Sequence, residues 1–528
     1  MPSWELIYKA TVYIAEEMGV ALKRSAFSPN IRERMDHSCA IVDKKGRIVA
    51  QAEHIPVHLG SFRVCVRNII GWIENSGEDL GEGDMLIFND PYISGTHLND
   101  VTVIAPIYRG GIHIGYVINK AHQVDVGGPM PGSMNPIART IYEEGLIIPP
   151  IKVVKKGSVD KEVMRIITAN TKTPLVTEGD TKAQIAANIV GSRRVAELVE
   201  RYGLEAVEDA WEKAISHGRA LAMSKISGWR RGVFEAEDYL ELEDQDPVIR
   251  VKLEIGEDVR VDFTGTSKQV DKPYNAVYGV TYAAVVYPIR SLIEGDIPVN
   301  EGFYSIVEVS APEGTIVNPR KPAPVSGGNV ETSQRVADTV LKALSTAIPE
   351  RVPAAGSGTM MNVMIGGEDP STGYWAYYET IGGGSGGRPG KHGVSGVHVN
   401  MTNTMNTPIE VAERVYPVLY TAYRIREDSG GRGRYRGGDG IIRSFRVLRP
   451  ARLSIMAERI KRAPWGLNGG EPGKPGRIVI RKRDGRELIM PSKFTIDLDE
   501  GDEVIIETPG GGGWGSISAI TSQALRMF

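Results

Sequence analysis

Two β-rich runs separated by a glycine pair constrain the fold of this chain more than any other feature. The runs VTVIAPIYR (101–109) and IHIGYVINK (112–120) are rich in β-branched residues, and Gly110 and Gly111 lie between them. A glycine pair between two such runs is typical of a tight hairpin turn. The pattern therefore predicts a long antiparallel hairpin, whose pairing brings the segments at its open end together.

Those flanking segments carry one motif twice. GTHLNDV and KAHQVDVGG each contain a histidine followed three residues later by an aspartate, although the chain has only nine histidines. Counting back from the glycine turn, Asp100 faces Ala121 and Asn99 faces His122. Paired positions lie about 5 Å apart and diagonal ones about 7 Å. A slip of one residue would turn a given side chain to the other face of the hairpin.

The two motifs together form a candidate metal site. His97, Asp100 and His122, with Asp125 nearby, offer two imidazoles and one or two carboxylates. This donor set suits Mn, Fe or Zn and leaves positions open for water or substrate. The alternative is that the histidines satisfy loop backbone groups or pair with their own aspartates. The sequence does not decide between these two interpretations.

The remaining patterns predict a chain that mixes helices and strands. We expect helices where apolar residues recur at helical spacing, and strands where β-rich runs are bounded by turn residues. The expected helical segments are residues 4–27, 60–77, most of 157–228, and 331–348. The expected strands are a hairpin over 38–51, a strand at 84–90, two strands within 248–265, and further strands from about 431 to 508.

These elements predict a multidomain α+β protein with mixed or antiparallel sheets and β-rich middle and C-terminal regions. At 528 residues the chain is too long for one ordinary domain. The expected parts are an N-terminal α+β domain with the metal-site hairpin (1–155), a helical segment (156–232), a β-rich middle region with a helix (233–350), a glycine-rich and β-rich C-terminal region (351–515), and a tail (516–528).

Composition narrows the class of protein. The net charge is -3, which gives no basic field for nucleic acid or an anionic membrane. Cys39 and Cys65, the two cysteines, cannot build a disulfide framework, so a reducing compartment is expected. The amphipathic N-terminus carries acids, unlike a signal peptide, and no window resembles a membrane span of about 18 apolar residues. We therefore expect a cytoplasmic protein.

Other motifs are less specific. In AEHIPVHLGS, Pro56 between His54 and His58 favours an extended loop over a chelating helix. IGGGSGGRPG lacks a P-loop pattern, and GGRGRYRGGDG lacks the strand-to-helix context of a dinucleotide site. Arginines in the second segment either hold a phosphate or carboxylate or form a solvated turn. Since no nucleotide motif is present, an ATP-dependent activity would need another subunit to supply the nucleotide site.

Blocks along nearly the whole chain resemble the hydantoinase B/oxoprolinase family. They include SAFSPNIRERMDHSCAIVDKKGRIVAQAEHIPVHLGS, NDPYISGTHLNDVTVIAPIY, NKAHQVDVGG, GDTKAQIAANIVG, YETIGGGSGG, HVNMTNTMNTPIEVAE, DSGGRGRYRGGDG and TPGGGGWG, in the family's order. The family includes the B-type component of N-methylhydantoinase, the C-terminal half of 5-oxoprolinase, and the large subunits of acetone and acetophenone carboxylases. Ser94 before the Gly-Thr of the histidine block and Asn99 before its aspartate depart from the family's usual Gly and Pro.

The resemblance implies a partner and a metal. Such proteins work beside an A-type subunit of actin-like ATPase fold, which binds ATP and phosphorylates an amide, ketone or bicarbonate oxygen. In the carboxylase branch, manganese is held by positions that match His97, Asp100 and His122. We therefore expect a hetero-oligomer with a divalent metal (Mn, Zn or Fe) on this chain and ATP on its partner.

Further roles follow as hypotheses. Asp125 is a candidate for orienting His122 or deprotonating water, and His54 and His58 are candidates for the same pocket. The backbone at Gly127 and Gly128 would allow close approach of substrate. Arg32 and Arg34 would clamp a carboxylate or phosphate, unless they are solvated surface residues.

Three functions fit this chain. The first is the B-type subunit of an ATP-dependent cyclic amidohydrolase of the hydantoinase or 5-oxoprolinase type. The second is the large subunit of an ATP-dependent ketone carboxylase. The third is a non-catalytic scaffold for the ATPase partner.

Overall fold

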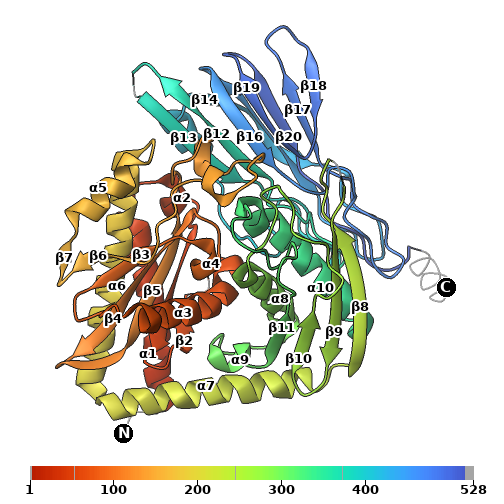
Figure 1. Cartoon of the computed structure of the whole chain (residues 1–528). Coiled ribbons are helices and arrows are strands. Elements are labelled where there is room, and N and C mark those ends of the chain that lie inside the picture. The colour runs from red at the N-terminus through yellow and green to blue at the C-terminus, as the bar shows by residue number, and fades with distance from the viewer. Residues whose placement is uncertain (1–2, 53, 244, 372, 518–528) are drawn as a thin grey trace.

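The computed structural model describes residues 3–52, 54–243, 245–371 and 373–517. Within them the chain is a multidomain α+β protein with four sheets and helices packed on several of them (Figure 1). The predicted fold class is thus confirmed. The predicted segment boundaries stay a prediction, and most of the predicted tail (518–528) lies outside the described residues.

The N-terminal sheet is antiparallel, with strand order β2-β1-β5-β4-β3-β6-β7. Its strands are β1 (His37–Asp43), β2 (Ile48–Gln51), β3 (Met85–Phe88), β4 (Asp100–Arg109), β5 (Ile112–His122), β6 (Ile151–Lys155) and β7 (Ser158–Val159). Its central strands are buried on both faces. The predicted hairpins over 38–51 and 101–120 are both present in it.

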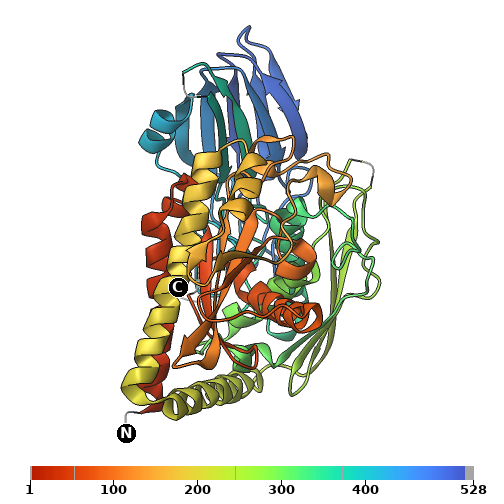
Figure 2. The same ribbon diagram turned by 60° about the vertical axis from the view of Figure 1, so that its left-hand side comes forward.

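Helices cover both faces of this sheet. α1 (Trp4–Ser25) and α6 (Pro174–Tyr202) lie side by side on one face, as Figure 2 shows. α3 (Pro56–Ser76) packs on the other face. Successive residues of a strand point to opposite faces and so belong to different cores. Cys39 packs with α1 and α6, whereas Ala40 packs with α3. This double cover explains why the strands read as continuous apolar runs.

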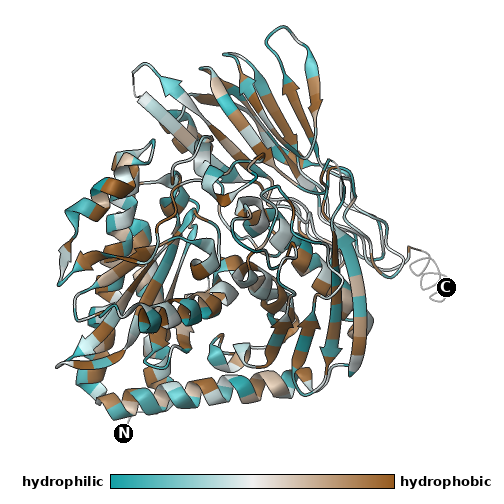
Figure 3. Cartoon of the chain, in the orientation of Figure 1, coloured by the Kyte–Doolittle hydropathy of each residue, from teal (hydrophilic) through white to brown (hydrophobic). Residues whose placement is uncertain are grey.

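α7 (Leu204–Ile226) connects the N-terminal region to the middle region. It runs along the base of the molecule to the second sheet (Figure 1). That sheet has the order β11-β10-β9-β8, and only β10 and β11 pair in parallel. Its strands are β8 (Gly232–Tyr239), β9 (Val248–Ile255), β10 (Val259–Asp262) and β11 (Val307–Ser310). Along β9, hydrophobic and hydrophilic residues alternate (Figure 3), which is typical of a sheet with one buried face.

Two helices of the middle region join it to its neighbours. α8 (Tyr278–Leu292) packs against α3, and α10 (Ser333–Ala347) packs against α8, β8 and β9. The shorter helices are α2 (Pro29–Arg32), α4 (Pro91–Ser94), α5 (Lys161–Ala169), α9 (Glu301–Tyr304), α11 (Ile409–Val415), the 3-10 turns η1 (Pro131–Ser133) and η2 (Ile141–Glu143), and the π-type turn η3 (Gly328–Thr332).

The C-terminal region consists of two antiparallel sheets around a third core. One has the order β13-β12-β16-β19 and the other β14-β15-β20-β17-β18. Their strands are β12 (Asn362–Asp369), β13 (Gly373–Thr380), β14 (Val418–Arg426), β15 (Gly440–Val447), β16 (Ala451–Met456), β17 (Arg477–Arg481), β18 (Glu487–Met490), β19 (Lys493–Leu498) and β20 (Glu503–Glu507).

The glycine-rich segments of this region pack against one another. A Cβ on Gly511 would lie 2.0 Å from the carbonyl oxygen of Ser385, and one on Gly384 would lie 1.9 Å from that of Gly438. Backbone hydrogen bonds such as Gly431 N–H to Gly511 O join the segments. The glycines are needed because any side chain would force the backbone segments apart. The side chains of Arg432 and Arg434 beside these glycines are exposed.

The β4–β5 hairpin differs from its predicted register by one residue. Asp100 pairs with His122, not with Ala121, because the ladder shifts between Ile107 and Tyr108. The extra residue is taken up on β5 near its turn, an irregularity that the apolar pattern does not reveal. The shift places Asp100 directly opposite His122, closer than the diagonal position that we expected.

No helix within the described residues is long and apolar enough to cross a membrane.

Candidate metal centre

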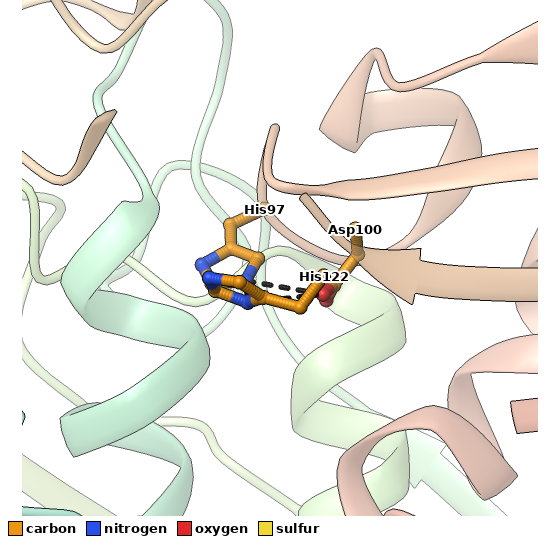
Figure 4. Close-up of side chains that lie close together, drawn as sticks. All are labelled: His97, Asp100 and His122. Atoms are coloured by element: carbon orange, nitrogen blue, oxygen red, sulfur yellow. Dashed lines mark hydrogen bonds and ion pairs between the residues drawn. The ribbon is translucent and has the colours of Figure 1, made fainter. Parts of the chain in front are cut away.

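The two H-x-x-D motifs meet at the open end of the hairpin. His97 lies in the loop before β4, Asp100 is the first residue of β4, and His122 is the last of β5 (Figure 4). Asp100 Oδ1 is 3.3 Å from His97 Nε2 and 3.6 Å from His122 Nδ1, and the two ring nitrogens are 3.2 Å apart. All three side chains are buried, and their ligand atoms lie within 4.8 Å of one another.

This geometry suits a metal ion. Ligand atoms about 2.1 Å from an ion lie about 3.0–3.4 Å apart in octahedral or tetrahedral coordination, close to the separations here. The cluster borders a cavity of about 20 Å³ lined also by His58 and Asp36. Asp100 Oδ2 and His122 Nε2 are buried and have no hydrogen-bond partner among the described residues. The residues present therefore fit a divalent cation, and the cluster could hold one.

His58 reaches the same carboxylate from α3. Its Nε2 atom lies 3.3 Å from Asp100 Oδ2, and its Nδ1 atom is hydrogen-bonded to Ser38 Oγ at 3.1 Å. The predicted extended loop around Pro56 is wrong, because Pro56 occupies the first position of α3, where proline is favoured. The helix start is what turns His58 toward the cavity.

Asp36 is a member that sequence reasoning missed. Its carboxylate lies 3.8 Å from His122 Nδ1, and its carbonyl oxygen accepts a hydrogen bond from the His122 backbone N–H at 3.0 Å. The only signal was its place just before the strand that pairs with β5, where His37 faces Ala121. That pairing joins strands far apart in the sequence, so local patterns did not reveal it.

The charges of the cluster are mutually dependent. Burial opposes charge on His97, but the neighbouring Asp100 carboxylate outweighs it and raises the pKa of His97. Burial also opposes charge on Asp100, yet His97 and His58 hold the pKa of that carboxyl well below its usual value. Burial lowers the pKa of His122, which keeps its ring neutral. A divalent cation would take the place of the proton that Asp100 now favours on His97.

His97 is oriented from its far side. Its Nδ1–H donates to the Ser326 carbonyl oxygen at 3.4 Å, which leaves Nε2 to face Asp100. The Ser326 backbone N–H in turn donates to Glu144, and burial raises the pKa of Glu144 to about 7. A hydrogen bond at the second ring nitrogen is the usual device that fixes a metal-binding histidine.

Three other predicted residues do not line the cavity. His54 Nε2 lies 3.5 Å from Glu16 Oε2, beside α1. Arg32 is exposed and pairs with Glu33. Arg34 is completely buried, but its guanidinium donates to the Tyr378 carbonyl and the Thr380 hydroxyl. Each of these three side chains therefore contacts other groups of the protein outside the cavity.

Asp125 and its glycines build a neighbouring loop. The Asp125 carboxylate accepts hydrogen bonds from the Gly127 and Lys172 backbone N–H groups and from the Ser133 hydroxyl, and its Oδ1 atom lies 3.7 Å from the Lys172 ammonium. Gly127 and Gly128 have positive φ angles of 91° and 77°. Asp125 therefore orients a loop next to the site, and its predicted role toward His122 stays a prediction.

Cys39 and Cys65 are buried and free. Burial raises the pKa of both thiols, that of Cys65 to about 11. Neither thiol is set up as a nucleophile.

Comparison with known proteins places this chain in a family. A family model described as Hydantoinase B/oxoprolinase matches residues 3–517, and the chain belongs to this family. The resemblance stated from the sequence blocks is confirmed.

The region that matches this chain makes up nearly all of some relatives and less than half of others. An uncharacterized protein of Methanocaldococcus jannaschii is 51% identical, covering 97% of this chain and 90% of that protein. 5-Oxoprolinase 1 of Arabidopsis thaliana is 40% identical over 95% of this chain, but this chain spans only 41% of it. The B-type component of a putative D-/L-hydantoinase from a Pseudomonas species is 34% identical, with 95% and 88% covered.

Two solved structures have the same fold. An ATP-dependent caprolactamase from Pseudomonas jessenii superposes with a TM-score of 0.90 and 27% identity, covering 99% of this chain and 93% of that one. An acetone carboxylase superposes with a TM-score of 0.90 and 20% identity, covering 97% and 75%, which shows the fold alone.

Proposed function

We propose that this chain is the B-type subunit of an ATP-dependent cyclic amidohydrolase that opens a lactam or hydantoin ring. The observation that carries the proposal is the buried meeting of His97, Asp100 and His122, with His58 beside them. The names of the relatives, 5-oxoprolinase, D-/L-hydantoinase and caprolactamase, support a cyclic amide as substrate. The nucleotide would be bound by an A-type ATPase partner.

The chemistry needs activation because an unstrained amide resists attack by water. Transfer of the γ-phosphoryl group of ATP to the amide oxygen would make the ring carbon electrophilic. Addition of water and cleavage of the C–N bond, with protonation of the nitrogen, would leave an acyl phosphate, which a second water hydrolyses. This chain would serve the steps that follow phosphorylation.

His97, Asp100 and His122 would hold a divalent metal ion. When bound, the ion supplies Lewis acidity, which stabilises developing negative charge and promotes deprotonation of water. Mn, Zn and Fe all accept this donor set.

The chain's own residues would do the rest. His58 Nε2, 3.3 Å from Asp100 Oδ2, is placed to take or return a proton at the cavity wall. Asn329, Thr402 and Thr404 line the same cavity and offer hydrogen-bond donors for a developing oxyanion. The cavity of about 20 Å³ has room for about one water molecule. A ring substrate would therefore require the cavity wall to move.

The test is reconstitution with an A-type partner from the same genome. ATP hydrolysis and ring opening are measured with 5-oxoproline, hydantoin and caprolactam, with and without bicarbonate. The proposal expects ATP hydrolysis that depends on one of these cyclic amides and yields the ring-opened acid. Dependence on bicarbonate with a ketone would instead establish a carboxylase, and ATPase activity unaffected by this chain's site variants would establish a scaffold.

A further inference from the structure

His122 is held in a different way from His97. The second ring nitrogen of His97 donates to the Ser326 carbonyl oxygen, whereas His122 Nε2 is buried and has no hydrogen-bond partner in the part of the chain that the structure describes. A hydrogen bond at the ring nitrogen that points away from Asp100 therefore fixes His97 but not His122. Some other contact has to keep His122 Nδ1 turned toward Asp100.

That contact is an aromatic stack from the C-terminal region. The Tyr378 ring of β13 lies parallel to the His122 ring, with centroids 4.5 Å apart and an interplanar angle of 10°. The Tyr378 hydroxyl donates to Asn362 Oδ1 at 2.9 Å, which pins the phenol to β12. Tyr378 also lines the cavity beside the metal cluster. Rotation of the imidazole would break the stack.

Arg34 holds Tyr378 in turn. Its guanidinium lies over the Tyr378 ring, 4.6 Å from the centroid, and it donates to Tyr378 O at 3.2 Å and to Thr380 Oγ1 at 2.9 Å. Arg34 is completely buried and follows α2 of the N-terminal region. A planar guanidinium stacks on a ring and bonds at its edges simultaneously, which lysine does not do.

We propose that Tyr378 and Arg34 are positioning residues that orient His122 as a metal ligand, so that the C-terminal region completes a site otherwise built by the N-terminal sheet. The proposal rests on the proposed function in one respect, that the cluster binds a metal ion. It assigns Arg34 a role different from the substrate clamp predicted from the sequence. It also gives a physical reason why the two regions have to be docked for the site to form.

The test measures metal binding by the isolated full-length chain. Mn²⁺ is titrated by calorimetry, and the electron paramagnetic resonance spectrum of the bound ion reports the ligand symmetry. Tyr378→Leu removes the ring and Tyr378→Phe keeps it. Since partners outside the coordination sphere typically contribute about 10- to 100-fold to metal affinity, we expect Tyr378→Leu to weaken binding by that factor and broaden the spectrum. Tyr378→Phe should stay within about threefold of wild type on the same scale.

Two further variants distinguish a loss of metal affinity caused by the missing stack from one caused by a general disturbance of the fold. Tyr374→Leu alters a half-buried tyrosine nearer the start of β13 and should leave Mn²⁺ affinity unchanged. Arg34→Lys keeps the charge but loses the stack and should weaken binding less than Tyr378→Leu, which makes it informative if the leucine variant fails to fold. Thermal unfolding of each apo-protein reports folding independently.

The outcomes separate the two proposals. Wild-type binding that is lost in Asp100→Asn but unchanged in Tyr378→Leu, or in Arg34→Lys where the leucine variant does not fold, would overturn the positioning role and leave the metal site standing. Absence of Mn²⁺, Zn²⁺ or Fe²⁺ binding by the wild-type chain would overturn both.

Discussion

Two buried clusters of charge in this molecule use carboxylates in opposite ways. In the metal cluster, Asp100 faces histidines and a small cavity. In the other, which we call the arginine network, three cations directly contact three carboxylates. The network comprises Asp238 of β8, Arg335 and Asp338 of α10, and Glu458, Arg459 and Lys493.

The difference lies in the partners. Arg335 and Arg459 each lie 2.8 Å from Asp338 Oδ2, and arginine keeps its charge at any ordinary pH. Such a cluster is already neutralised and joins the middle sheet, α10 and the C-terminal region. Histidines neutralise the Asp100 carboxylate only when they are protonated. The negative charge of Asp100 and the adjacent cavity therefore allow the metal cluster to bind a cation. Both clusters bury charged groups. Arginine partners make the arginine network a structural contact between regions, whereas histidine partners leave the metal cluster able to bind a ligand.

The largest effect should come from the metal cluster. Asp100→Asn and His97→Ala should each reduce turnover of the reconstituted enzyme more than about 100-fold, since even partners outside the coordination sphere contribute about 10- to 100-fold. Co-purification with the A-type partner should be unchanged. His113→Ala, near the turn of the same hairpin, is the control. Near-wild-type turnover in either site variant would contradict the metal role.

Arg335→Met should have its effect on stability instead. Removing one partner of a buried ion pair leaves uncompensated carboxylates and typically costs about 3–5 kcal/mol of unfolding free energy. Denaturant unfolding measures this loss, and Mn²⁺ affinity measured under native conditions should not change. If Arg335→Met abolished metal binding in a folded protein, the two clusters would not be separate devices.

Metal should stabilise the wild-type chain reversibly. At a free metal concentration about 100-fold above Kd, binding to the native state alone contributes about 2.7 kcal/mol. Thermal unfolding should therefore shift upward with Mn²⁺ and return with chelator. The shift should be absent in His97→Ala and present in Arg335→Met, and the reverse pattern would place the ion elsewhere.

The smallest effect is the pH dependence of stability that Asp238 of the arginine network contributes. Burial opposes charge on Asp238, but Arg335 and Arg459 hold its pKa well below the ordinary value of 3.8. As the pH falls to about 4, Asp238 therefore binds a proton in the unfolded state but not in the native state. The resulting stability is present above about pH 4 and is lost as the pH falls below it. Acid unfolding of Asp238→Asn should show a shallower slope there than wild type, and an unchanged slope would contradict this assignment.

Much of the fold was predictable because its signals are local. The helix over 4–27, the two N-terminal hairpins and the strand pair within 248–265 each follow from spacing and turn residues, and the structure confirms them. The hairpin pattern alone also predicts that His97, Asp100 and His122 lie close together.

What could not be predicted depends on contacts between distant segments. The irregularity at Ile107 decides the register that sets Asp100 opposite His122. Asp36 enters through pairing of β1 with β5, and Tyr378 lies more than 250 residues from His122 in sequence. No periodic sequence pattern reveals the stack, so the sequence predicts Arg34 only as a substrate clamp or a solvated surface residue.

The central claim is that one divalent ion binds between the two H-x-x-D motifs. Anomalous diffraction from crystals of the chain grown with Mn²⁺ tests it most directly. We expect one anomalous peak per chain, bounded by His97 Nε2, His122 Nδ1 and the Asp100 carboxylate, and no such peak in Asp100→Asn crystals. A peak elsewhere in the wild-type chain, with none at this position, would contradict the claim.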